Sequence, residues 1–229
     1  MAGAARGERT PNDADEQLCA AARRVLEEVR TTRAPGEVLD EARRQLERVI
    51  DVLAPHAHEG GFAQADREGG LGLYGQSRDP MALFPYSPLI GRLNPVAPPV
   101  EFWMDGDVVR GRAVFRSPYC GPPNHVHGGV VAGVLDELLG VVNVMHGRGA
   151  MTGTLTIKYR APTPLFEEIR MLGCPAGVDG RKVYAEGSLW HGETLLAEAE
   201  GVFILIGEEA RSKLGIASDS GLPRRGSDG

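Results

Sequence analysis

The sequence predicts an α+β protein. After residue 100 most of the chain alternates between apolar and polar residues with the period of two that is typical of strands, and one long apolar helix interrupts this pattern. Before residue 60 the apolar residues recur at spacings of three and four, which predicts two amphipathic helices. A helix followed by an antiparallel meander with short connections favours one sheet with the helix lying on it.

The composition is that of a globular protein with one sizeable core and an appendage. The chain has 229 residues, of which 42% are hydrophobic and 24% charged. Its 25 basic and 31 acidic residues leave no basic field that would attract nucleic acid or anionic lipid, so we expect no nucleic-acid partner. The N-terminus has no apolar signal segment, and no stretch approaches the roughly eighteen uninterrupted apolar residues of a membrane span. We therefore expect no membrane partner and a cytoplasmic location.

The cysteines favour a reducing compartment. Cys19, Cys120 and Cys174 are odd in number and far apart, and none belongs to a CxxC pair. This pattern argues against a disulfide framework and against a thiolate metal site.

Three zones follow one another along the chain. Helical spacing from Asp13 to Arg30 and again from Val38 to Leu53 is broken at Ala34-Pro35-Gly36, which predicts a helical pair. Residues 59–99 are rich in Gly and Pro and predict a long irregular connection on a surface. We therefore expect a helical extension with a linker in residues 1–80, the strand-rich domain in 81–208, and a disordered tail in 209–229.

The strand-rich domain divides into six strands. A first pair is expected across the Asp105-Gly106-Asp107 turn, and short hairpin turns are expected at Asp179-Gly180 and His191-Gly192. The six predicted strands are Val100–Met104, a strand starting at Val108, Thr152–Arg160, Glu168–Val178, Lys182–Trp190 and Thr194–Ile206.

The central helix, from Gly128 to about His146, is apolar on nearly all sides, so we expect the domain to wrap around it. One narrow stripe of small or polar residues breaks this pattern: Gly129, Gly133, Asp136, Gly140 and Asn143. A glycine inside a helix costs roughly 0.5 to 1 kcal/mol relative to alanine. Three of them on one face predict that another backbone or a ligand packs closely there.

The stretch His127-Gly128-Gly129, six further residues and Asp136 resembles a motif of the hotdog-fold acyl-CoA thioesterases of the PaaI type. The similarity extends to Met151-Thr152, to the strand LTIKYRAPTP and to SLWHGETLLAEAEGVFILI, and covers about residues 94–206. It implies a hotdog fold, an antiparallel sheet wrapped around a central helix, in the domain 81–208. It also implies hydrolysis of a medium-chain or aromatic acyl-CoA without a metal or redox cofactor.

The resemblance also implies roles for four residues. Asp136 would be the general base or the nucleophile, and the Gly128 N–H the donor to the oxyanion. His127 would orient the thioester or its loop, and Thr152 would hydrogen-bond the aspartate or the attacking water. The chemistry agrees, because the free amides at a helix N-terminus can receive a developing negative charge and a carboxylate can activate water.

Spacing predicts how these residues can cooperate. Gly128 and Asp136 are eight residues apart, which is about 12 Å along a helix. One carbonyl group cannot touch both, so we expect Asp136 of one subunit to face Gly128 of another across a two-fold axis. The prediction is an obligate homodimer with two equivalent sites, in agreement with the dimer-interface sites of the resembling family.

The strand Thr152–Arg160 suggests a larger assembly. If Thr152 faces the helix, strict alternation turns Leu155 and Ile157 to the outside unless a bulge resets the phase. An apolar outer face would need cover, which favours a homotetramer. Lys158, Arg160 and Arg148 are candidates for binding the phosphates of coenzyme A, and plain surface charges are the alternative.

Several alternatives stay open. Asp136 could be a structural acid, and Glu137 beside it is the rival for the chemistry. His125, His127, Cys120 and His146 form only a weak metal pattern. The protein could also be a hotdog protein without activity that binds an acyl-CoA or serves in assembly, with the helical pair as its partner surface. A hotdog hydratase is less attractive, because its Asp-His dyad pattern does not occur here.

Overall fold

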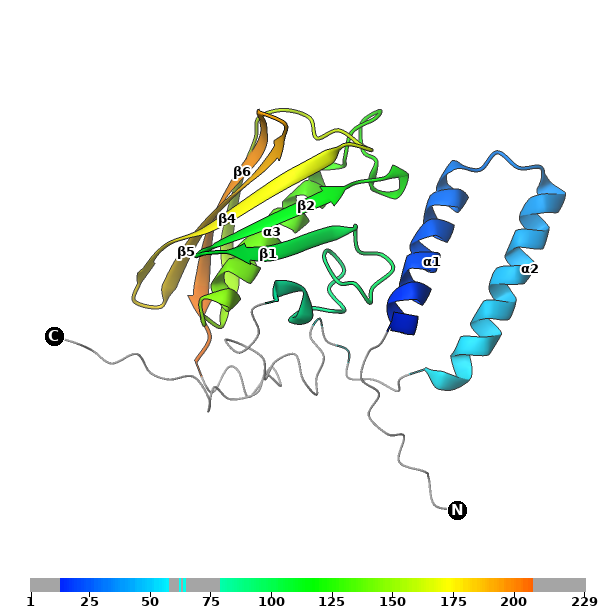
Figure 1. Ribbon diagram of the computed structural model, residues 1–229, viewed down its shortest axis with the longest axis horizontal. Coiled ribbons are helices and arrows are strands. Elements are labelled where there is room, and N and C mark those ends of the chain that lie inside the picture. Colours follow the sequence, from blue (N-terminus) through cyan, green and yellow to red (C-terminus); the bar gives the residue numbers. More distant parts are fainter. Residues whose placement is uncertain (1–12, 58–61, 63, 65–78, 208–229) are drawn as a thin grey trace, which may run out of the picture.

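The computed structural model describes residues 13–57, 62, 64 and 79–207. One antiparallel sheet of six strands, in the order β1-β2-β4-β5-β6-β3, curves around helix α3 (Figure 1). The strands are β1 (Val100–Asp105), β2 (Val108–Val114), β3 (Ala150–Tyr159), β4 (Glu168–Asp179), β5 (Lys182–His191) and β6 (Thr194–Leu205). The predicted α+β class and hotdog fold are confirmed.

The predicted hairpin turns are present. β4 joins β5 through Gly180 and β5 joins β6 through Gly192, with φ angles of 55° and 54° that glycine adopts without strain. The turn between β1 and β2 contains Gly106, as expected.

Helix α3 (Gly128–Met145) is the centre of the core. Half of its residues are buried, and its side chains share one apolar cluster with inward-facing residues of the strands such as Ile169, Leu189 and Phe203. Each fully buried aliphatic side chain contributes roughly 1.5 to 3 kcal/mol to folding. By length and composition α3 could cross a membrane, but the surrounding sheet accounts for its apolar surface.

A β-bulge in β3 corrects the prediction for the outer face of this strand. The pairing between β3 and β6 shifts register between Thr152 and Thr154, so Gly153 is an extra residue. The bulge resets the alternation, and Leu155 and Ile157 pack against the core on the same side as Thr152. The predicted apolar outer face is therefore wrong, and the argument from it for a homotetramer does not hold.

The segment before β1 also differs from the prediction. The described part of the Gly- and Pro-rich connection, residues 79–99, was expected on a surface, yet it lies partly in the core. It contains a short 3-10 helix, η3 (Pro80–Ala82), and four almost completely buried apolar residues: Met81, Leu83, Ile90 and Ala97. Turn hydrogen bonds satisfy much of its backbone, including those that Ser87 Oγ accepts from the N–H groups of Leu89 and Ile90.

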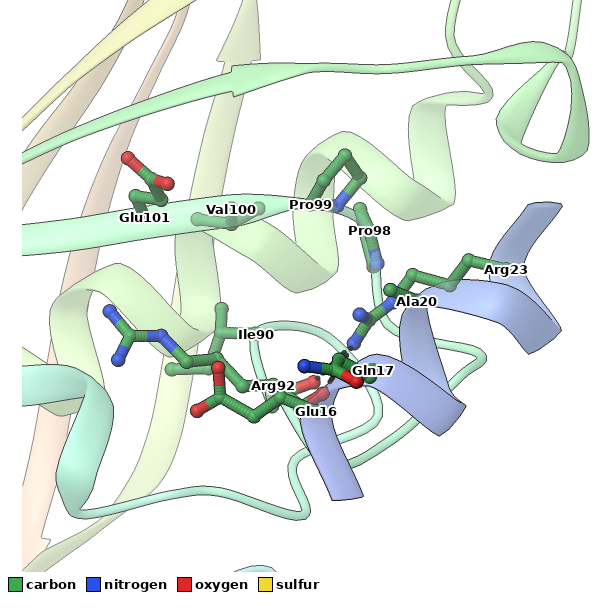
Figure 2. A pocket seen from close by; sticks show the side chains of 11 residues that line it. Glu16, Gln17, Ala20, Arg23, Ile90, Arg92, Pro98, Pro99, Val100 and Glu101 are labelled. Carbon is green, nitrogen blue, oxygen red and sulfur yellow. Dashed lines mark hydrogen bonds between the residues drawn. The ribbon is translucent and has the colours of Figure 1, made fainter. Parts of the chain in front are cut away.

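The predicted helical pair is formed by α1 (Asp13–Thr31) and α2 (Gly36–Leu53), which stand beside the sheet (Figure 1). Arg23 ties α1 to the domain, because its guanidinium donates hydrogen bonds to the carbonyl oxygens of Gly91, Arg92, Asn94 and Ala97. Figure 2 shows Arg23 reaching from α1 toward this loop. No residue of α1 or α2 is fully buried. The predicted tail, residues 209–229, lies outside the described residues.

Candidate active site

The N-terminus of α3 has a free backbone amide where the sequence predicts the oxyanion donor. His127 caps the helix: its Nδ1 accepts a hydrogen bond from the Gly129 N–H at 3.0 Å, and its carbonyl oxygen accepts from Val130 and Val131. Among the described residues, nothing accepts a hydrogen bond from the Gly128 N–H. The positive end of the helix dipole lies at this amide, so it is suited to bind a negatively charged oxygen.

His127 is exposed, and its ring is held in place by this cap. The ring thus caps the helix that begins with Gly128, and its role in orienting the thioester or this loop stays a prediction. Because Nδ1 accepts from an amide, the neutral ring carries its proton on Nε2.

Tyr159 is a site residue that the sequence reasoning missed. Its hydroxyl donates a hydrogen bond to the Gly128 carbonyl oxygen at 2.9 Å and ties the end of β3 to the start of α3. Strict alternation from Thr152 would turn Tyr159 outward, and the bulge at Gly153 turns it inward. A lone glycine inside a strand pattern is the signal that could have indicated this bulge.

Asp136 and Thr152 form the predicted pair. Thr152 Oγ1 donates a hydrogen bond to Asp136 Oδ1 at 2.9 Å, and the aspartate is half-buried on the face of α3 next to β3. The described part of the chain supplies no donor to the second oxygen, Oδ2. One oxygen is thus fixed in direction while the other is available to a water molecule or a substrate.

Glu137, the rival acid, lies in a different environment. It faces the segment before β1, where Ser87 Oγ donates a hydrogen bond to Oε1 at 2.8 Å and Gln64 Nε2 lies 2.8 Å from each of its oxygens. Burial raises the pKa of Glu137, the hydrogen bonds from Ser87 and Gln64 oppose this shift, and the charge of Asp136 adds to it. Both carboxylate oxygens are engaged within the protein, so Glu137 anchors this segment to α3.

The two halves of the predicted site do not meet within one chain. α3 is a continuous helix, so the eight residues from Gly128 to Asp136 correspond to about 12 Å along its axis. The stripe of small residues is also not open along its whole length, because the side chain of Leu89 covers Gly133.

The candidate phosphate-binding cations do not gather at one place. Lys158 Nζ pairs with Glu200 at 3.0 Å, and Arg160 pairs with Glu198, both between β3 and β6. Arg148 precedes β3 at its other end. Exposed ion pairs of this kind contribute little to stability and open readily for a ligand, so coenzyme A binding by these residues stays a prediction.

No metal centre is formed among the described residues, where no group of three His, Cys, Asp or Glu side chains could hold an ion. The Nδ1 atoms of His125 and His146 each lie within hydrogen-bond distance of a backbone carbonyl oxygen, those of Pro123 and Val142.

Comparison with known proteins agrees with this fold. No model of a protein family matches the sequence. A crystal structure described as a thioesterase superfamily protein is 32% identical, with a TM-score of 0.72, and the match covers 86% of this chain and 93% of that one.

Two curated relatives are acyl-coenzyme A thioesterases named THEM4. The protein from Xenopus laevis is 34% identical over 90 residues, which are 38% of this chain and 40% of the relative. The one from Mus musculus is 32% identical over 91 residues, which are 39% of each chain. The matched region thus spans about two fifths of the length of these relatives. Because the solved structure is matched over nearly its whole length, the chain belongs to the thioesterase superfamily.

Proposed function

We propose that the protein is an acyl-CoA thioesterase. The observation that carries this proposal is the pair of Asp136 and Thr152 on the open face of a helix whose first amide, the Gly128 N–H, has no acceptor among the described residues. These are the two components that thioester hydrolysis needs: a group that activates water or attacks directly, and a donor to the carbonyl oxygen. The activity of the two curated relatives supports the same reaction.

In the proposed reaction Asp136 takes a proton from a water molecule that attacks the carbonyl carbon of the thioester. The carbonyl electrons move to the oxygen, where the Gly128 N–H stabilises the negative charge. When the carbonyl group forms again, the carbon–sulfur bond breaks and coenzyme A leaves as the thiol with the proton that Asp136 had accepted. In the alternative route the Asp136 carboxylate attacks the carbonyl carbon, the carbon–sulfur bond breaks and coenzyme A leaves as the thiolate. Water then hydrolyses the resulting anhydride, which releases the carboxylic acid, regenerates the Asp136 carboxylate and supplies the proton that the thiolate takes up.

The site is completed by a second copy of the chain. Because about 12 Å separates Gly128 from Asp136 along α3, the donor to the oxyanion at one Asp136 would be the Gly128 N–H of the partner subunit, brought there by a two-fold axis. We propose a homodimer with two equivalent sites. The substrate would be a medium-chain or aromatic acyl-CoA, with Lys158, Arg160 and Arg148 as candidates to bind its phosphates.

The test is the release of free thiol from a panel of acyl-CoA esters by the wild type, Asp136→Asn and Glu137→Gln. We expect Asp136→Asn to lower kcat by roughly 100-fold or more, as loss of a general base does, while Glu137→Gln stays within a few-fold of the wild type. Undiminished hydrolysis by Asp136→Asn would remove Asp136 from the mechanism. No hydrolysis by the wild type would favour a protein that only binds acyl-CoA.

A further inference from the structure

The face of α3 that carries Asp136 continues toward the C-terminal end of the helix. Gly140 and Asn143 follow Asp136 at spacings of four and three residues, so all three lie on one side of α3. A Cβ atom placed on Gly140 would meet no atom within 4 Å, whereas Leu89 covers Gly133 in the N-terminal half. Beside Gly140 the described part of the chain therefore leaves open space next to the candidate catalytic acid.

Asn143, which lies three residues beyond Gly140 on the same side of α3, has an unusual environment. It is only 1% exposed, and neither Oδ1 nor Nδ2 has a hydrogen-bond partner among the described residues. Arg148 is close by, since its backbone N–H donates to the Asn143 carbonyl oxygen at 2.9 Å, and its Nη1 is also buried without a partner. Buried polar atoms are nearly always hydrogen-bonded, and leaving them unpaired costs free energy that a polar ligand would recover.

The two ends of α3 differ in their exposure to solvent. His127 and Gly129 at the start of α3 are exposed, whereas Val141, Val142 and Asn143 near its end are buried. In the proposed dimer the exposed N-terminus of the partner's α3 lies at Asp136 and suits the entry of the large coenzyme A group, whereas the buried residues beyond Asp136 suit the tip of the acyl group. Asn143 lies seven residues beyond Asp136, which is about 10 Å along the helix.

We propose that Asn143 is a specificity-determining residue that selects acyl groups carrying a hydroxyl group about 10 Å from the thioester. A hydroxyl oxygen can accept a hydrogen bond from Nδ2 and donate one to Oδ1, so a single substituent satisfies both atoms. An acyl group without a hydroxyl would leave the side-chain amide of Asn143 without a hydrogen-bond partner. The assignment rests on the proposed thioesterase function, and the hydroxyl group belongs either to the end of an aliphatic chain or to an aromatic ring.

Two matched substrate pairs test the proposal. Octanoyl-CoA is compared with ω-hydroxyoctanoyl-CoA, and phenylpropanoyl-CoA with para-hydroxyphenylpropanoyl-CoA, so the pairs also distinguish an aliphatic from an aromatic hydroxyl. In the wild type we expect kcat/KM for the hydroxylated member of at least one pair to be roughly tenfold higher or more. In Asn143→Leu, which has a similar volume and no polar atoms, we expect this preference to disappear or reverse.

Stability separates recognition from a structural role. Asn143→Leu removes two unpaired polar atoms, so we expect its melting temperature to equal or exceed that of the wild type. The matched control is Val134→Ala, a fully buried residue of the same helix that belongs to the hydrophobic core. We expect this control to lower the melting temperature and to keep the hydroxyl preference.

The outcomes also separate this proposal from the thioesterase proposal. If both members of each pair are hydrolysed and the ratio of their kcat/KM values is the same in Asn143→Leu as in the wild type, the proposed role of Asn143 is overturned. The proposed thioesterase function would still stand. If the wild type hydrolyses none of them, binding is measured with non-hydrolysable thioether analogues of the same pairs. Tighter binding of a hydroxylated analogue that depends on Asn143 would then support the assignment without the activity, and equal binding would overturn it.

Discussion

The first turn of α3 contains a backbone amide, the N–H of Gly128, that has no acceptor among the described residues. The neighbouring amides are used: Gly129 donates to the His127 ring, and Val130 and Val131 donate to its carbonyl oxygen. The cap therefore satisfies the helix start and leaves one donor for a ligand. This arrangement allows a test in which proline replaces the one amide hydrogen with a ring carbon.

Gly128→Pro should abolish the oxyanion donor without disturbing the helix. Proline has no N–H and is favoured at the first helical position, and His127 before it has φ −62° and ψ 132°, which a residue preceding proline adopts readily. We expect kcat for thioester hydrolysis to fall roughly 100- to 1000-fold. The matched control is Gly128→Ala, which keeps the N–H and whose Cβ meets Tyr159 at an ordinary 3.7 Å. Equal activity of the two variants would rule out this amide as the donor.

Glu137 predicts a pH dependence of stability. Burial raises its pKa in the folded protein, so the folded state binds more protons than the unfolded state at intermediate pH. Its contribution to stability is therefore greatest below about pH 4.3, where glutamate titrates in an unfolded chain, and is lost as the pH rises through the higher folded pKa.

We expect Glu137→Gln, which stays neutral, to lack this loss. Urea unfolding of both proteins at a series of pH values measures it: the stability of the variant relative to the wild type should increase as the pH rises through this window, then level off. Parallel curves for the two proteins would contradict the raised pKa of Glu137.

At the scale of elements, Arg23 makes most of the hydrogen bonds that the described residues show between α1 and the rest of the domain. The Arg23 guanidinium donates to four carbonyl oxygens of the loop before β1. A second link is the ion pair between exposed Arg116 and partly buried Glu27 at 3.7 Å. The apolar residues of α1 are at most partly buried, so packing alone holds this helix weakly.

Arg23→Met should therefore loosen α1 from the domain, because it removes these hydrogen bonds while it keeps the apolar stem. We expect faster hydrogen exchange in the loop of residues 90–98 and faster proteolysis near Ala34, with thioester hydrolysis retained. Arg24→Met, on the exposed side of the same helix, is the matched control and should leave both rates unchanged. If the Arg23 variant behaves like this control, α1 is held by something other than this side chain.

β3 illustrates what local pattern can and cannot predict about an element. Its alternation of residues predicted a strand from Thr152 to Arg160, and a strand is found at Ala150–Tyr159. The side on which Leu155, Ile157 and Tyr159 lie could not be read from alternation, because it depends on the bulge that forms when β3 pairs with β6.

At the scale of the whole molecule, the separation between Gly128 and Asp136 makes the proposed dimer testable by complementation. Asp136→Asn and Gly128→Pro are each expected to inactivate the homodimer. In a mixed dimer, one site would combine the intact Asp136 of one subunit with the intact Gly128 N–H of the other.

Co-expression of the two variants with different affinity tags, followed by tandem purification of the mixed dimer, should therefore restore about half of the wild-type kcat per dimer, since one of two sites is intact. Each variant purified alone is the control. A mixed dimer as inactive as its parents, or a monomer with full activity, would refute a site shared between subunits.

The sequence by itself determined the kind and order of the helices and strands and identified Asp136, Gly128, His127 and Thr152 as candidate site residues. It could do so because helical and strand periods, turn residues and a short motif are local properties of a chain. Only the tertiary structure decided which way β3 faces, that residues 79–99 enter the core, and that Glu137 is engaged by Gln64 and Ser87, which are 73 and 50 positions away in the chain. Such features depend on pairing and burial between distant segments, and local periodicity contains no information about those partners.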